Sequence, residues 1–114
     1  MTAATPAYRW CSLYVDTPDQ AGVVAETGRL LGTPSDLDVF TVPGFTVDVR
    51  RNPDRTVSDH FLDWRTMVDV DAEEHVPNRE VVRFVAGLMT HLRSRGYRVA
   101  AECDFSSELP SGGS

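Results

Sequence analysis

The chain has 114 residues and a formal net charge of −6, from 17 acidic and 11 basic side chains. This length fits one domain and leaves little room for a second hydrophobic core. The acidic balance argues against a general nucleic-acid binder, because such proteins bind by neutralising phosphates with basic side chains. No run of eighteen apolar residues occurs, and the first ten residues lack a basic and apolar leader, so we expect a cytoplasmic protein without a membrane segment.

The first half of the chain predicts a strand, a helix and a second strand. Residues 8–16 alternate aromatic side chains with a second set of side chains, which is the period of a strand. Thr17 is a candidate helix cap, and the helix should run to Leu31 and stop at the following glycine. The next strand is predicted over 39–50, where the Pro43-Gly44 pair favours an edge position or a bulge.

The second half of the chain predicts strand, helix and strand again. Residues 60–71 alternate over the longest strand candidate, which ends in acidic residues. Asn78 is a candidate cap for a helix over 79–95, and Gly96 can end that helix in the left-handed conformation. A final strand follows over 97–105.

This order of elements resembles the ferredoxin-like arrangement in topology. The resemblance implies an α+β fold, βαββαβ, with a four-stranded antiparallel sheet and two helices on one face. The single domain should span 8–105, with a flexible N-terminus at 1–7 and a flexible C-terminal tail at 106–114. A fold of this type hosts unrelated functions, so function must be argued from the surfaces.

Alternation divides the strand residues between two faces of the predicted sheet. The face under the helices should carry Leu13, Val15, Val47, Val49, Trp64, Val68, Val70, Val99 and Ala101. Tyr8, Trp10 and Tyr14 then lie together on the opposite, helix-free face, beside Arg65 and Met67. A contiguous aromatic patch on an open sheet face is typical of an interface.

Three interpretations compete for this aromatic face. Base stacking, as in an RNA-recognition module, is opposed by the acidic flanks and by the absence of a glycine-aromatic signature. Self-association through the sheet would give a homodimer, as in dimeric cofactor-independent enzymes of this topology. Docking of a different protein suits the Tyr, Trp and Arg side chains, which commonly anchor such contacts.

The stretch MVDVDAEEH, residues 67–75, holds Asp69, Asp71, Glu73 and Glu74 before His75. A calcium loop would need a glycine at its bend, and none occurs between Gly44 and Gly87. Cys11 and Cys103 are too far apart in sequence for a zinc knuckle, and we expect them to pack as small hydrophobic residues. We therefore expect no metal and no cofactor. The acidic run is either a solvated strand end or a patch that receives basic side chains from a partner.

The sequence favours a binding protein over an enzyme. Candidate catalytic groups are scattered, and no nucleophile or phosphate-binding motif accompanies them: His60, Asp63, His75, His91, Cys103 and Asp104. The chain looks like the general type of bacterial immunity or antitoxin-like proteins, which are compact and negatively charged. This likeness implies a basic protein partner, and self-association through the open sheet face is the other option. We expect neither nucleic acid nor a membrane as a target.

The predicted partner-binding residues combine a contact centre with acidic residues that steer a cationic surface. The contact centre is formed by Trp10, Tyr14, Arg65 and Met67. The steering acidic residues are Asp48, Asp69, Asp71 and Glu102. The alternative is a dimeric ferredoxin-like, cofactor-independent enzyme or a small-ligand-binding protein. Its pocket would lie between sheet and helices and would be lined by Trp64, Phe84, Met89 and His91.

Overall fold

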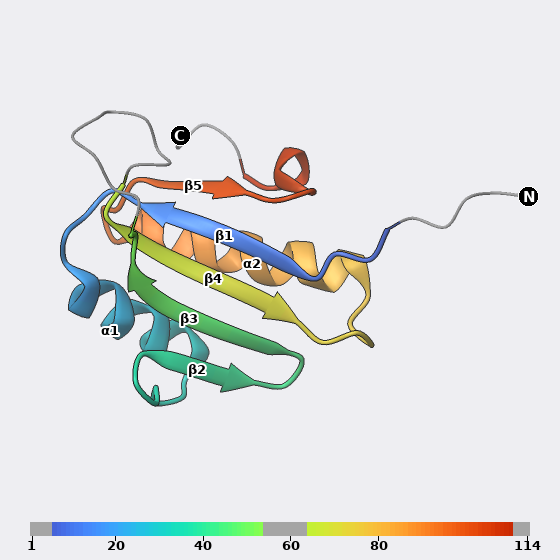
Figure 1. Cartoon of the computed structure of the whole chain (residues 1–114), viewed down its shortest axis with the longest axis horizontal. Helices are drawn as coiled ribbons and strands as arrows, with labels where there is room; N and C mark the ends of the chain where they lie inside the picture. Colours follow the sequence, from blue (N-terminus) through green and yellow to red (C-terminus); the bar gives the residue numbers. More distant parts are fainter. Residues whose placement is uncertain (1–5, 54–63, 111–114) are drawn as a thin grey trace, which may run out of the picture.

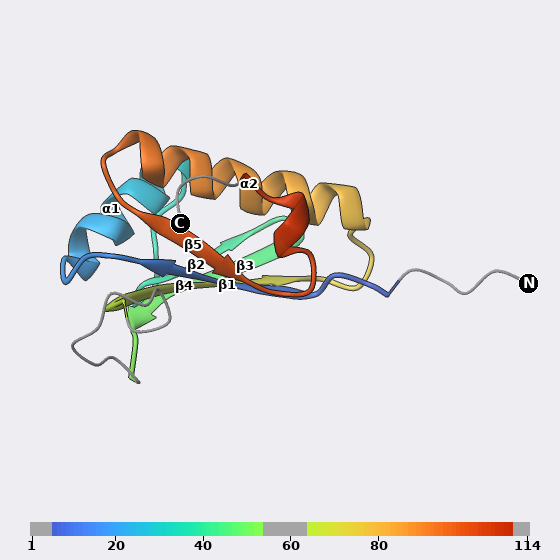
Figure 2. The ribbon, with the colours of Figure 1, turned by 90° about the horizontal axis from the view of Figure 1, so that it is seen from above.

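The computed structural model describes residues 6–53 and 64–110. In chain order the elements of these segments are β1 (Trp10–Val15), α1 (Gln20–Leu31), β2 (Val39–Val42), β3 (Phe45–Arg51), β4 (Thr66–Ala72), α2 (Asn78–Ser94), β5 (Val99–Glu102) and η2 (Ser106–Glu108), the last a short 3₁₀ helix. The strands form one antiparallel sheet in the order β2-β3-β4-β1-β5 (Figure 1). Both helices lie against the same face of this sheet (Figure 2). The α+β prediction, with two helices on one side of an antiparallel sheet, is confirmed.

The prediction of a four-stranded ferredoxin-like sheet is wrong in strand number. The segment predicted as one strand over 39–50 forms a hairpin in which β2 pairs with β3, with Val42 opposite Phe45. The turn falls at Pro43 and Gly44, and Gly44 has φ +87, a conformation that a side chain disfavours. Proline followed by a glycine with positive φ is a tight-turn signal rather than a bulge. The sheet therefore gains β2 as an additional edge strand.

Neither helix is capped by the residue that the sequence predicted. Asp19, and not Thr17, caps α1 by accepting a hydrogen bond from the Gly22 amide at 3.0 Å. The first residue of α2 is Asn78, whose side chain makes no cap hydrogen bond. It accepts instead from the Tyr8 amide at 2.8 Å and so fastens the segment before β1 to the start of α2. The predicted ends at Leu31 and Gly96 agree with the structure to within two residues.

The main core lies between the sheet and the helices, and it confirms the predicted orientation of β1. Cys11, Leu13 and Val15 are at most 1% exposed and pack against both helices' apolar residues. The remaining strand residues predicted for this face are also in the core or packed on it, except one: Val47, Val49, Val68, Val70, Val99 and Ala101. The exception is Trp64. It lies before β4, outside the alternation of that strand, and packs in a different cluster.

The two ends of the described chain also pack against the core. Tyr8 stacks on Phe105 with ring centroids 4.6 Å apart, and its hydroxyl donates to Glu108 at 2.5 Å. This hydrogen bond is the chief cause of the raised pKa of the Tyr8 phenol. Leu109, within the predicted flexible tail, is buried in the core beyond η2. Among the described helices, none is both long and apolar enough to cross a membrane.

Candidate functional site

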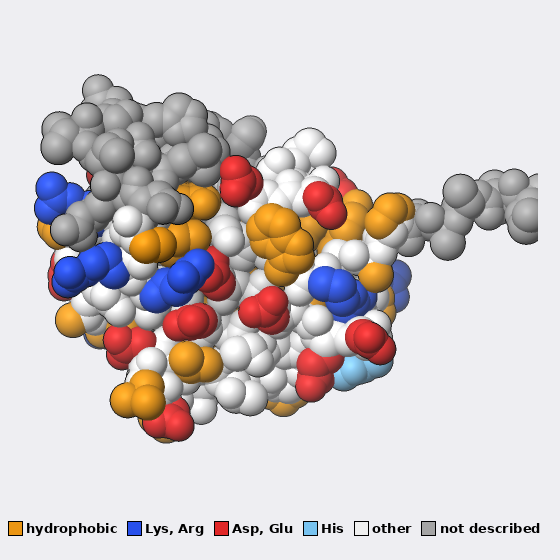
Figure 3. Space-filling model, in the orientation of Figure 1, with side chains coloured by type: hydrophobic (Ala, Val, Ile, Leu, Met, Phe, Trp, Pro, Cys, Tyr) orange, Lys and Arg blue, Asp and Glu red, His pale blue; other side chains and the backbone are white. Residues whose placement is uncertain are grey.

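The helix-free face of the sheet collects most of the predicted partner-binding residues. Alternation along β1 places Trp10, Ser12 and Tyr14 on this face, because Cys11, Leu13 and Val15 point into the core. The strand pairing then fixes their neighbours on β4, with Asp71 opposite Trp10 and Asp69 opposite Ser12. In the orientation of Figure 1, the space-filling view shows acidic side chains spread among apolar and basic ones on this side (Figure 3).

A row of carboxylates runs across the middle of this face. Asp48 of β3 lies opposite Asp69 of β4, Asp69 lies opposite Ser12, and Ser12 lies opposite Glu102 of β5. Asp69 is held on both oxygens, because Arg50 Nε approaches Oδ2 at 2.6 Å and the Ser12 hydroxyl donates to Oδ1 at 2.8 Å. The row therefore contains one carboxylate held by neighbouring side chains, between two that make no hydrogen bond or ion pair within the described segments.

Trp10 stands beside this row at the end of the sheet where β1 begins. Trp10 is 47% exposed, and within residues 6–53 and 64–110 it is the one large aromatic residue that is exposed rather than buried or partly buried. The indole borders a pocket of about 220 Å³. The pocket is lined by Trp10, Cys11, Ser12, Asp69, Val70 and Asp71. An aromatic ring and two carboxylates around one pocket suit a cationic side chain, which gains from both.

Tyr14 and Met67 belong to the same face but are already covered in the free protein. Tyr14 is 9% exposed and Met67 is 6% exposed, and both pack with Trp64 and Ala100 in a second, smaller apolar cluster. The Arg98 guanidinium lies 4.8 Å from the centroid of the Trp64 ring, in cation–π geometry. The expected group of three exposed aromatic residues is therefore reduced to Trp10, since Tyr8 stacks on Phe105 and Tyr14 is buried.

Arg65 lies away from Trp10 in the structure. It directly precedes Thr66, which pairs with Val15 at the far end of β1. Val15 lies five positions after Trp10, which corresponds to roughly 17 Å along the strand. Arg65 lines its own pocket of about 170 Å³ together with Pro18, Gln20, Arg51 and Thr66. The predicted contact centre thus separates into an acidic and aromatic end at Trp10 and a basic end at Arg65.

Ser12 and Arg50 were not among the predicted site residues, although their side chains set the conformation of Asp69. A sequence signal for both existed. Ser12 alternates with Trp10 and Tyr14, and Arg50 alternates with Asp48, so each had to share their face. What the sequence could not supply was the register, which brings residues of β1 and β3 to opposite sides of the same carboxylate.

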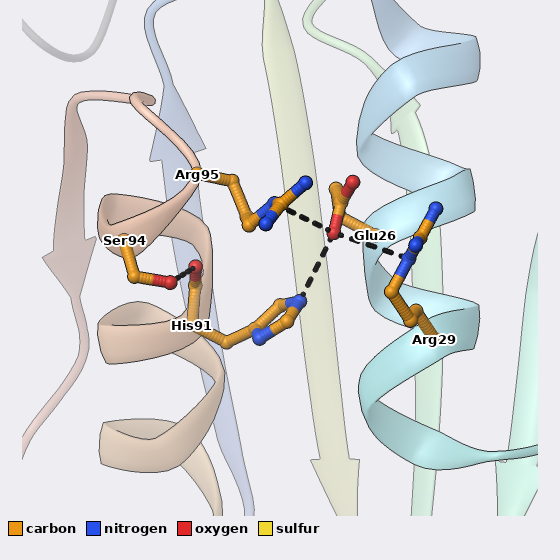
Figure 4. Close-up of polar contacts among 5 residues, drawn as sticks. All are labelled: Glu26, Arg29, His91, Ser94 and Arg95. Atoms are coloured by element: carbon orange, nitrogen blue, oxygen red, sulfur yellow. Dashed lines mark hydrogen bonds and ion pairs between the residues drawn. The ribbon is translucent and has the colours of Figure 1, made fainter.

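His91, one of the candidate catalytic groups in the sequence, bridges the two helices. Its Nε2 lies 3.2 Å from Glu26 Oε1 on α1 (Figure 4). The same oxygen also lies 3.3 Å from Arg95 Nε and 3.6 Å from Arg29 Nε. Glu26 is thus the centre of an interhelix ion-pair network, called the hub below. These contacts hold α1 against α2, which is a structural role. His75 has a 74% exposed side chain near Glu73, while His60 and Asp63 lie outside the described residues.

The residues of the alternative ligand pocket are not assembled around one space. Trp64 packs with Tyr14 on the helix-free face, whereas Met89 is buried in the core on the other side of the sheet. Phe84 stacks on Phe45 with ring centroids 3.9 Å apart. Within 6–53 and 64–110, no group of three or more His, Cys, Asp or Glu side chains is placed to hold a metal ion.

Comparison with known proteins adds no relative: no family model, curated protein or solved structure matches this chain. The functional argument therefore starts from the residues of the helix-free face themselves.

Proposed function

We propose that this chain is a small acidic protein-binding module that captures a basic partner protein on its helix-free sheet face, in the manner of immunity or antitoxin-like proteins. The observation that carries the proposal is the pocket at the start of β1, where a half-exposed indole meets Asp69 and Asp71. The predicted contact centre is accordingly narrowed to Trp10, because Tyr14 and Met67 are already buried in the second apolar cluster.

The chemistry of this pocket favours an arginine or lysine side chain as the inserted group. The face of an indole attracts a cation, and a carboxylate adds charge-assisted hydrogen bonds. Asp69 is already engaged by Arg50 and Ser12. Asp71 makes no hydrogen bond or ion pair with the rest of the described chain, so its two oxygens are open to a guanidinium fork.

The charge of the whole chain supports the same kind of partner. A net charge of −6 attracts a basic surface from a distance and increases the association rate. Asp48 and Glu102, in the same row as Asp69, place part of this charge on the binding face.

The same charges argue for a foreign partner over a second copy of the chain. A symmetric dimer through this face would bring identical surfaces together. Asp48, Asp71 and Glu102 of one copy would then approach the same acidic face of the other, at an electrostatic cost that a basic partner does not meet.

The proposal is tested by affinity capture from an extract of the native cell, with four single-residue variants as baits. Trp10→Ala and Asp71→Asn alter the pocket. Leu30→Ala and Glu80→Gln are matched controls, because Leu30 is a similarly exposed apolar residue on α1 and Glu80 is an exposed acid on α2. If Trp10 anchors the contact, its truncation should weaken binding by about 2 kcal/mol, or roughly 30-fold in Kd.

A basic protein retained by the wild type and both controls, but lost with both pocket variants, supports the proposal. Binding should also weaken as salt concentration rises, because exposed charges are screened. Equal capture by wild type and Trp10→Ala removes this pocket from the contact. Sedimentation that shows a dimer of the protein alone, dispersed by Trp10→Ala, would instead favour self-association.

A further inference from the structure

The two cysteines of the chain are neighbours across the β1–β5 pair. Ser12 of β1 lies opposite Glu102 of β5, and one further step of this antiparallel register brings Cys11 opposite Cys103. Directly opposed residues of antiparallel strands have Cα atoms about 4.5–5.5 Å apart. This separation lies within the range of about 4.4–6.8 Å that a disulfide bond requires. Both thiols are free in the structure.

The side chains of the pair point to the same side of the sheet. Cys11 is a member of the main core, and Cys103 packs against that core from the end of β5. The two thiols lie close enough that each shifts the pKa of the other. Cys103 directly follows the last residue of β5, so it lies at the end of the paired segment.

The environments of the two thiols differ in a way that assigns them different roles. Cys11 is 1% exposed, whereas Cys103 is only partly buried. The neighbouring Cys11 thiol is the chief cause of the lowered pKa of the Cys103 thiol, and the Phe105 backbone lowers it further. The neighbouring Cys103 sulfur, together with burial, raises the pKa of Cys11. Cys103 is therefore the accessible thiolate, and Cys11 is the protonated thiol behind it.

We propose that Cys11 and Cys103 form a peroxide-responsive dithiol–disulfide pair that links β1 to β5. In the first step the Cys103 thiolate attacks one oxygen of hydrogen peroxide. A sulfur–oxygen bond forms, the oxygen–oxygen bond breaks, and the departing hydroxide takes a proton to become water. In the second step the Cys11 sulfur attacks the Cys103 sulfur, and the sulfenic hydroxyl leaves with the Cys11 proton as a second water.

The atoms and electrons of this sequence balance. Two thiols and one peroxide give one disulfide and two waters, so the two sulfur atoms lose two electrons and the two peroxide oxygens gain them. The pair is independent of partner binding. It does, however, flank the proposed surface, because Trp10 directly precedes Cys11 and Glu102 directly precedes Cys103.

The test treats the reduced full-length protein with a small excess of hydrogen peroxide, blocks the remaining thiols and maps peptides without reduction. The expected result is a monomer that has lost two hydrogen atoms, with Cys11 joined to Cys103, and dithiothreitol should reverse it. Oxidation should raise the urea midpoint, because the bond closes a loop across almost the whole described chain. Two unmodified thiols, a bond between two molecules, or sulfinic acid on Cys103 beside a free Cys11 would each overturn the proposal.

Two variants separate the roles, and the wild-type peptide map does not depend on their folding. Cys11→Ala should leave a sulfenic acid on Cys103 that dimedone traps. Its alkylation by iodoacetamide should also require a higher pH than in the wild type, because Cys103 loses the neighbouring thiol that lowers its pKa. Cys103→Ser should leave Cys11 reduced at the same peroxide concentration. Oxidation of Cys11 at the wild-type rate in Cys103→Ser would contradict the assignment.

Discussion

Replacing Asp48 by asparagine should stabilise the free protein while it weakens capture of a basic partner. Asp48 lies directly opposite Asp69 on the helix-free face, and like charges in that position destabilise an antiparallel pair. Asp69 is neutralised by Arg50 at 2.6 Å. Asp48 itself has no hydrogen bond or ion pair in the described segments. A carboxylate kept in such a position is consistent with a surface selected for binding.

The size of the effect follows from the separation of the two side chains. Directly opposed Cβ atoms lie about 5 Å apart, and two unit charges at that distance repel by about 0.8 kcal/mol in water. Arg50 cancels part of this repulsion, so Asp48→Asn should raise the free energy of unfolding by ~0.5 kcal/mol. For a domain of this size that corresponds to roughly 2 °C in Tm.

Urea denaturation at low and at high salt measures this prediction. The gain from Asp48→Asn should be larger at low salt, since screening already relieves the repulsion in the wild type at high salt. Glu80→Gln, on α2, is the matched control for loss of one negative charge. Destabilisation by Asp48→Asn, or an equal gain in the control, would refute the reasoning that the acidic row is electrostatically strained.

Three further predictions concern the packing of the fold. Glu26→Gln should cost about 1–2 kcal/mol in urea denaturation, because the carboxylate shared by two arginines and a histidine is only 13% exposed. Arg29→Gln, at the 67% exposed member of the hub, should cost little, and equal costs would contradict the hub. Leu109→Ala should cost about 2–3 kcal/mol if the segment after η2 is part of the core, whereas Ser107→Ala on the exposed side should be neutral. The pKa of Tyr97 is raised above 10.0, chiefly by desolvation, so its contribution to stability is complete below that pH and declines as pH rises through the folded pKa. Wild type should therefore lose stability more steeply above pH 10 than Tyr97→Phe, and parallel curves would count against the raised pKa.

Local signals were sufficient for the C-terminal ends of the helices and for the faces of β1. The glycines predicted to end both helices act through short-range chemistry, and the observed helix ends lie within two residues of them. The alternation of Trp10, Ser12 and Tyr14 with core residues gave the correct face of β1, because strand geometry alone dictates it.

Errors arose where long-range packing decided the outcome. Alternation counted from Trp64 failed because β4 begins at Thr66, which left the indole free to cover Tyr14 on the other side of the sheet. The burial of Tyr14 depends on this contact and on Met67, neither of which a single-strand pattern contains. The adjacency of Cys11 and Cys103 likewise requires the β1–β5 register.

The claim that the helix-free face binds a cationic side chain at Trp10 is tested most directly by an NMR titration with a short arginine-rich peptide. The two indole N–H signals provide an internal comparison, because Trp10 is 47% exposed and Trp64 is 4% exposed. We predict saturable shifts for the Trp10 indole and for the Asp71 amide, diminished by salt and absent in Asp71→Asn, with little change at Trp64. Shifts confined to α1 and α2, with Trp10 unmoved, would contradict the account.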